Sequence, residues 1–290
     1  MIISGFTIAR GAVAFGYPLQ ESLRSLLPLV DELVVNVGDS DDGTWEAVQR
    51  IGDSRIVAFR SEWDMSLRDG LALSTETNKA LARCRGEWGV YLQADEVLHE
   101  AELPALRAKL IRYRPTRVEA FSLRYYHFFG SYGTYKDEPR DWYPWATRIV
   151  RTGVGIHSVG DAAAFMVRDG ERWRRPRRRD LAMRVYHYGR VRPPAQMLSK
   201  QRNLERFYHD ESWLAEHGLQ EDMDPEQLYA ERRHLRVFMG THPAVMRERV
   251  ATQNWPSSVP VRRGPEWLRR AWVYGSWVLS KLLRRMMTAR

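Results

Sequence analysis

Short apolar runs alternate with amphipathic segments through the first half of the chain. Runs of about four to eight apolar residues indicate buried strands, whereas apolar residues that recur every three or four positions indicate helices. This pattern predicts strands at residues 4–9, 31–37, 55–59 and 87–92, and helices at residues 19–27, 45–51 and 69–83. The repeated strand and helix order is typical of an α/β fold with a mostly parallel sheet and right-handed crossovers.

The pattern changes after residue 115. Residues 118–129 alternate like a strand, and a loop rich in Gly, Tyr, Trp and Pro follows. The next part of the chain has a helical composition. We therefore expect an α/β domain at residues 1–194, a helical extension at 195–255 and a separate tail at 256–290.

Composition narrows the class of protein. The chain has 290 residues, of which 44% are apolar, and this suffices for one large core or for a core domain with a smaller appendage. A single cysteine, Cys84, excludes a disulfide framework and a cysteine-rich zinc site, and it is typical of a reducing compartment. The amino terminus has no basic segment followed by a long apolar run, so we expect no signal peptide and a cytoplasmic protein.

The net charge of +9 is concentrated in two segments. Residues 168–192 and residues 262–290 each carry +7, so the remaining 236 residues carry −5. The protein is thus a mildly acidic body with two basic segments, and we expect no nucleic-acid partner.

The second basic segment also contains an apolar helical stripe, which includes Trp267, Trp272 and Leu279. Its uncharged run, residues 271–280, is only ten residues long, about half of what a membrane-spanning helix needs. We expect this helix to lie in the surface of an anionic membrane, which makes the protein peripheral on the cytoplasmic face of the inner membrane. The alternative is a terminal helix that packs on the body or on a second subunit of a homo-oligomer.

The strand predicted at residues 87–92 is followed by two adjacent carboxylates, Asp95 and Glu96. The carboxyl ends of strands in open α/β sheets form the edge where ligands bind, and buried strands do not tolerate unpaired charges. Because carboxylates and substrate phosphates together form the usual Mg²⁺ or Mn²⁺ site, we predict a divalent metal that carries a diphosphate. The alternative is an exposed acidic turn that caps the next helix.

A second acidic turn, residues 38–44, follows the strand at 31–37. It is not an EF-hand, because Gly43 stands at the fifth place instead of the sixth and Arg50 stands at the twelfth. Its carboxylates are candidates for hydrogen bonds to the base or ribose of a nucleoside. Alternatively, Asp42 caps the helix that follows.

Four segments resemble the family 2 glycosyltransferases with the GT-A fold, especially enzymes of bacterial envelope polysaccharide and lipopolysaccharide core. The segments are Phe6–Arg10, Ser40–Thr44, Asn78–Gly86 leading into Tyr91–Glu96, and His187–Gly189. The resemblance implies a Rossmann-like catalytic domain with an inverting, metal-dependent activity. Such an enzyme moves a sugar from a nucleoside-diphosphate donor to a glycan or lipid-linked acceptor in cell-envelope polysaccharide synthesis.

The resemblance also implies site residues. The motif Gln93-Ala94-Asp95 stands where relatives have Asp-x-Asp, and its amide is still able to hydrogen-bond a ribose hydroxyl. The donor-binding residues are Ala9, Arg10, Asp39, Asp42, Asn78, Gln93, Ala94 and Asp95, with Arg192 and Lys200 as phosphate clamps. The ligands of Mg²⁺ or Mn²⁺ are Asp95, Glu96 and His187. The alternatives are a hydrogen-bonded core histidine for His187 and a solvated helix face for the two clamps.

An inverting transfer also needs a carboxylate that takes the proton of the acceptor hydroxyl. We choose Asp161, which follows the part of the chain that resembles the acceptor side of these enzymes; its alternative role is a local cap or salt bridge. Other candidates are Asp137, Glu138 and Asp141, in an aromatic loop whose rings either stack on sugars or pack in the core.

Functions of other classes account for fewer of these features. A nucleic-acid-binding protein would use the arginine runs but would leave the acidic strand end unexplained. A nucleotidyltransferase would share the nucleotide site, yet the chain has no Gly-x-Gly-x-x-Gly or Gly-x-x-x-x-Gly-Lys phosphate loop. A catalytically silent binding module is the third alternative, because Gln93 replaces a carboxylate.

Overall fold

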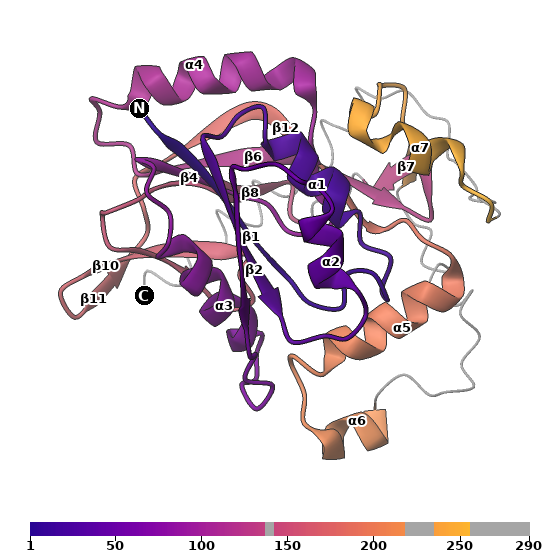
Figure 1. Cartoon of the computed structure of the whole chain (residues 1–290). Coiled ribbons are helices and arrows are strands. Elements are labelled where there is room, and N and C mark those ends of the chain that lie inside the picture. Colours follow the sequence, from indigo (N-terminus) through magenta and orange to yellow (C-terminus); the bar gives the residue numbers. More distant parts are fainter. Residues whose placement is uncertain (137–141, 218–234, 256–290) are drawn as a thin grey trace, which may run out of the picture.

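A computed structural model of the chain describes residues 1–136, 142–217 and 235–255. Within these ranges the fold is α/β, with a curled ten-stranded sheet flanked by helices (Figure 1). This confirms the predicted fold class. The predicted tail, residues 256–290, lies outside the described residues.

The first half of the chain forms the parallel part of the sheet. Its elements are β1 (Ile3–Ala9), α1 (Leu19–Leu26), β2 (Glu32–Gly38), α2 (Thr44–Gln49), β3 (Ile56–Ser61), α3 (Leu71–Leu81) and β4 (Trp88–Tyr91). Each lies within a few residues of its predicted position. The strands are ordered β3-β2-β1-β4 and all run parallel. Every residue of β1, β2 and β4 is buried, as expected for parallel strands covered on both faces.

The second half of the chain extends this sheet mainly through antiparallel pairs and adds a second, smaller sheet. It consists of β5 (Glu96–Leu98), a 3₁₀ turn (Glu100–Glu102), α4 (Leu103–Tyr113), β6 (Ala120–Phe129), β7 (Ser131–Lys136), β8 (Trp145–Arg151), β9 (Ile156–Val159), β10 (Ala164–Asp169), β11 (Arg172–Arg174) and β12 (Arg178–Arg190). Strand β8 pairs with β4 and β6, while β9, β10 and β11 form a separate small sheet.

Strand β12 lies beside Asp95 and Glu96, the two carboxylates that follow β4. It runs parallel to β6 and antiparallel to β5, and its register places His187 opposite both Glu96 and His127. His187 therefore lies beside the turn after β4, although it comes about 90 residues later in the sequence.

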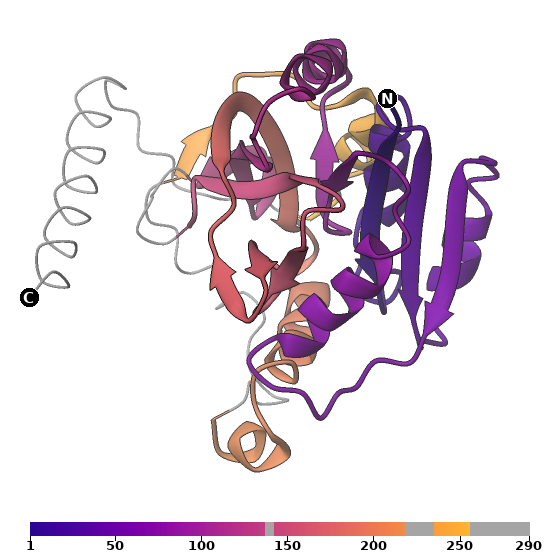
Figure 2. The ribbon, with the colours of Figure 1, turned by 90° about the vertical axis from the view of Figure 1, so that its left-hand side faces the viewer.

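The last described segment contains a strand as well as helices. Its elements are α5 (Pro194–Glu205), α6 (Glu211–His217), β13 (Leu235–Val237), a 3₁₀ turn (Ala244–Met246) and α7 (Arg247–Ala251). Because β13 pairs with β7, this segment belongs partly to the main sheet. Figure 2 shows α4 at one end of the molecule and α6 at the other. No helix in the described ranges is long and apolar enough to cross a membrane.

Part of the arginine-rich segment has an internal partner. Glu119, only 2% exposed, accepts two hydrogen bonds from the guanidinium of Arg174 at 2.7 Å each and one from the backbone N–H of Arg177 at 2.8 Å. The Arg177 side chain also pairs with this carboxylate. These contacts fix the chain between β11 and β12 against the start of β6.

Replacing Glu119 by Gln should lower the free energy of unfolding by about 2 kcal/mol at pH 7, because hydrogen bonds to charged groups are worth roughly 1.5–3 kcal/mol. Hydrogen bonding to Arg174 lowers the pKa of Glu119 from 4.5 to about 2. Since the folded state has the lower pKa, this stabilisation is present above about pH 4.5 and is lost as the pH falls toward 2.

Urea unfolding at a series of pH values measures this effect. The difference between wild type and Glu119→Gln should begin to shrink below about pH 4.5. The exposed Glu171→Gln serves as the control and should change stability little. Equal stability of wild type and Glu119→Gln at pH 7 would show that the arginine contacts contribute nothing.

Candidate functional site

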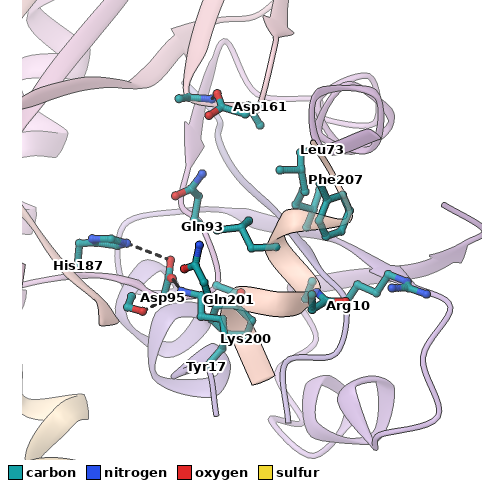
Figure 3. Close-up of a pocket in the computed structure, with 18 of the residues that line it drawn as sticks. Arg10, Tyr17, Leu73, Gln93, Asp95, Asp161, His187, Lys200, Gln201 and Phe207 are labelled. Carbon is teal, nitrogen blue, oxygen red and sulfur yellow. Dashed lines mark hydrogen bonds and ion pairs between the residues drawn. The ribbon is translucent and has the colours of Figure 1, made fainter. Parts of the chain in front are cut away.

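A cavity of about 290 Å³ lies at the carboxyl ends of β1 and β4, with α5 along one side (Figure 3). Among the described residues that line it, the cationic side chains are Arg10, Arg190 and Lys200, and the carboxylates are Asp95 and Asp161. Its aromatic lining consists of Tyr17, Trp63, Tyr91, Trp142, Tyr143, Phe207 and Tyr208. The cavity therefore combines opposite charges with flat apolar surfaces.

Asp95 lies at the end of the turn that follows β4 and is 6% exposed. Its Oδ2 accepts a hydrogen bond from the Lys200 ammonium at 3.0 Å, and His187 Nε2 lies 3.6 Å from Oδ1. Burial alone would raise the pKa of Asp95, but Lys200 and His187 outweigh burial and hold this pKa well below its usual range. Asp95 is therefore an ionised carboxylate inside the protein.

Lys200 projects from α5 and is held by three groups. Besides Asp95, its ammonium donates to the carbonyl of Gly189 at 2.8 Å and lies 4.7 Å from the centre of the Tyr17 ring. Burial lowers the pKa of Lys200 to about 8, against the opposing effect of Asp95. A Cβ at Gly189 would lie 2.5 Å from His187 Nε2 and 2.9 Å from Asp95 Oδ2, so this close approach requires glycine.

His187 contacts a second buried histidine. Its Nδ1 lies 2.9 Å from His127 Nδ1, while His127 Nε2 donates to the carbonyl of Tyr143 at 2.8 Å. Burial holds the pKa of His127 well below its usual range, so this ring is neutral. Because a carbonyl only accepts, the proton of His127 lies on Nε2 and its Nδ1 accepts from His187. His187 thus presents Nε2 to Asp95.

Glu96 faces the opposite way from Asp95, and its prediction as a metal ligand is wrong. It is 0% exposed and forms a two-point ion pair with the equally buried Arg148, at 2.7 and 2.8 Å. The Tyr125 hydroxyl and the Gln93 backbone N–H donate to the same carboxylate. Asp95, in the turn, lines the cavity, whereas Glu96, the first residue of β5, points into the core.

Two predicted donor-binding residues instead organise loops. Asp42 accepts hydrogen bonds from the backbone N–H groups of Val13 and Ala14, at 2.9 and 2.8 Å, and from Thr44 at the start of α2. Both of its oxygens are engaged outside the cavity, where they join the loop after β1 to the start of α2. The N-cap residue of α2 is Gly43, without a side-chain cap, so Asp42 is not the predicted helix cap. Asp39 does not line the cavity either, but it accepts from Arg10 Nε at 3.3 Å.

Two further donor-binding predictions are also contradicted by the geometry. The amide of Asn78 exchanges two hydrogen bonds with the backbone of Ser158, at 2.9 and 2.8 Å, and so ties α3 to β9. Arg192 is 1% exposed, donates to the Phe15 carbonyl and lies over the Tyr17 ring. Neither side chain lines the cavity.

Six predicted site residues on the donor side do line the cavity: Ala9, Arg10, Gln93, Ala94, Asp95 and Lys200. Asp161 also lines it, in the turn between β9 and β10. Its Oδ2 accepts from the Tyr208 hydroxyl at 3.2 Å and its Oδ1 from the Ala163 N–H at 3.2 Å. In Figure 3 Asp161 lies across the cavity from Asp95 and Lys200. The alternative carboxylates at 137, 138 and 141 lie outside the described residues.

Several lining residues have no signal in the sequence. Tyr17, Trp63, Arg190, Phe207 and Tyr208 belong to loops or strand and helix ends that only tertiary packing brings to the cavity. The aromatic loop was a partial exception, since two of its rings, Trp142 and Tyr143, line the cavity. By contrast, Tyr132 from the same stretch packs against Tyr188 in a separate cluster.

The residues near Asp95 do not fit a divalent metal. In the described part of the chain, no three His, Cys, Asp or Glu side chains gather as a metal site would require. Asp95 already pairs with Lys200, and Glu96 is occupied by Arg148. One paired carboxylate and one imidazole remain, which is a poor donor set for a cation that prefers several oxygens.

No family model matches the chain, and no curated protein matches it by sequence. Among solved structures, residues 1–349 of S. aureus TarS in complex with UDP-GlcNAc align with 15% identity and a TM-score of 0.41, over 70% of this chain and 65% of that chain. Glucosyl-3-phosphoglycerate synthase from Mycobacterium tuberculosis, in complex with Mn²⁺, UDP-glucose and phosphoglyceric acid, aligns with 23% identity and a TM-score of 0.31, over 43% of this chain and 44% of that one.

A third solved structure is 4-diphosphocytidyl-2C-methyl-D-erythritol synthase from Anaerococcus prevotii, with 14% identity and a TM-score of 0.34, over 52% of this chain and 70% of that one. The chain spans less than two thirds of the first TarS structure, at 64%. Structural similarity at these sequence identities and TM-scores does not indicate what reaction the chain catalyses or what it binds.

Changing Glu96 to Gln should lower the free energy of unfolding by about 3–5 kcal/mol, because it leaves the Arg148 guanidinium buried without its counter-charge. The double variant Glu96→Gln/Arg148→Met should lose less than the sum of the two single changes. Urea unfolding of all four proteins measures this coupling.

An exposed ion pair provides the control. Arg114 and Glu87 lie 2.7 Å apart with side chains 56% and 37% exposed, so Glu87→Gln should cost no more than about 1 kcal/mol. If Glu96→Gln is as stable as wild type, Glu96 is not the buried partner of Arg148.

Proposed function

We propose that the chain is a glycosyltransferase that moves a sugar from a nucleoside-diphosphate donor to a hydroxyl of a glycan or lipid-linked acceptor. The observation that carries this proposal is the arrangement of charges in one cavity: cations and Asp95 on one side, and Asp161 across from them (Figure 3). Transfer from a diphosphate needs positive charge at the leaving group and a base at the acceptor, on opposite sides of the sugar.

The donor would lie along the ends of β1 and β4. Arg10 and Lys200 supply positive charge for the diphosphate, and the Gln93 amide offers a donor and an acceptor to the ribose. The rings of Tyr17, Trp63 and Tyr91 give the flat surfaces on which a base or sugar packs. The proposal includes no metal, because the residues at Asp95 do not fit one.

Asp161 would act as the general base of an inverting transfer. The acceptor hydroxyl gives its proton to the Asp161 carboxylate as its oxygen bonds to the anomeric carbon, and the bond from that carbon to the diphosphate breaks. The Tyr208 hydroxyl and the Ala163 N–H hold the carboxylate in place through one hydrogen bond to each oxygen. The positive charge at Arg10 and Lys200 stabilises the departing diphosphate.

For the biological setting, the proposal has support from the sequence alone. The family resemblance supports a role in cell-envelope polysaccharide synthesis. The basic apolar tail at 262–290 supports docking on an anionic membrane from the cytoplasmic side, where a lipid-linked acceptor lies, or else contact with a second copy of the chain.

A ligand panel tests the proposal. Nucleoside diphosphates and sugar nucleotides should raise the melting temperature of the full chain, because a ligand that binds only the native state stabilises it. The productive sugar nucleotide should then be hydrolysed slowly to the nucleoside diphosphate. Release of pyrophosphate would indicate a nucleotidyltransferase, and stabilisation by duplex DNA or RNA alone would indicate a nucleic-acid-binding protein.

Asp161→Asn should slow transfer by about 10²–10⁴-fold, as expected for loss of a general base. The Kd of the donor should change no more than about twofold, because the carboxylate lies across the cavity from the cations. Single-turnover kinetics and calorimetric titration measure the two quantities. The control is Asp169→Asn, whose side chain is 78% exposed on the same small sheet. Equal losses in rate and binding would make Asp161 a structural residue.

A further inference from the structure

The turn after β4 presents a single carboxylate to the cavity. Gln93 stands at the position of the first aspartate in the Asp-x-Asp motif of the family that the sequence resembles. Glu96 points into the core, where it pairs with Arg148. An amide in place of a carboxylate removes a negative charge that helps hold a divalent cation. The motif therefore carries one negative charge, on Asp95.

This charge is already neutralised by a residue of the chain itself. The Lys200 ammonium lies 3.0 Å from Asp95, and the two side chains are only 11% and 9% exposed. A divalent cation on the same carboxylate would lie next to this ammonium, and like charges in a site with little water repel strongly.

Lys200 is presented by a helix rather than by a loop. Met197, Lys200, Gln201 and Leu204 all line the cavity, and their spacing places them on one face of α5. The carbonyl of Gly189 and the Tyr17 ring hold the ammonium from two further directions. Its position is thus set by the backbone of β12 and by α5 together.

We propose that the Lys200 ammonium takes the place of the divalent metal, so that the chain binds the diphosphate of its donor without a metal ion. This inference rests on the proposed function. An ammonium has three N–H donors, and the bonds to Asp95 and Gly189 use two of them. As far as the described residues show, the third remains for a phosphate oxygen. Asp95 is then the counter-ion of Lys200 and positions this ammonium for the donor, without binding the donor itself.

Calorimetric titration of the full chain with UDP, and in parallel with GDP, CDP and ADP, tests the inference. For the nucleotide that binds, the Kd of the wild type should agree within about twofold in EDTA and in MnCl₂. This comparison needs no variant, so it stands even if a substitution impairs folding.

Lys200→Met should raise that Kd at least tenfold in EDTA. Because this change frees Asp95, MnCl₂ should restore part of the affinity in the variant, and electron paramagnetic resonance should detect bound Mn²⁺ in Lys200→Met but not in the wild type without nucleotide. The control is Lys109→Met, an exposed lysine on α4, which should behave as wild type in both buffers.

The outcomes separate the inference from the function on which it rests. A wild type that binds nucleotide only with Mn²⁺, or a Lys200→Met variant that binds normally in EDTA, would overturn the inference and leave the glycosyltransferase proposal standing. A wild type that binds no nucleoside diphosphate or sugar nucleotide in either buffer would overturn both.

Discussion

The buried ion pair between Glu96 and Arg148 is the interaction on which the geometry of the cavity depends. Both side chains are fully buried, so each would be strongly destabilising without the other. Glu96 also accepts from the Gln93 N–H and the Tyr125 hydroxyl, which ties the turn after β4 to β6 and β8. The next residue back along the chain, Asp95, lines the cavity at the end of this fixed turn.

Strand β12 supplies the second constraint, because it carries the later chain to that turn. Its pairing with β5 sets His187 opposite Glu96, and the backbone N–H of Tyr188 donates to the carbonyl of Asp95 at 2.8 Å. Gly189 lets His187 and Asp95 approach its backbone closely, and its carbonyl accepts a hydrogen bond from Lys200. The turn after β4, strand β12 and helix α5 therefore hold the ionised carboxylate, the imidazole and the ammonium in place.

Four ion pairs in the described part of the chain differ in whether they reach the cavity. The pairs Glu96–Arg148 and Glu119–Arg174 lie away from the cavity and hold strands together. By contrast, Lys200 and its partner Asp95 both line the cavity, as does Arg10, whose partner Asp39 does not. The arginine run at 174–179 thus belongs in part to the architecture, which weakens its interpretation as a nucleic-acid surface.

The sequence by itself determined the order of strands and helices up to residue 92, the α/β class and the place of Asp95 at a strand end. These features follow from local periodicity and from where apolar runs stop. It also identified Arg10, Gln93, Asp161 and Lys200, which line the cavity. Only the tertiary structure decided that Glu96 faces Arg148, that Asn78 bonds Ser158 and that Lys200 neutralises Asp95. Each of these contacts joins residues 52 to 105 positions apart in the sequence. Strand register and helix packing decide which polar groups meet over such separations. Local sequence patterns do not encode that register or packing.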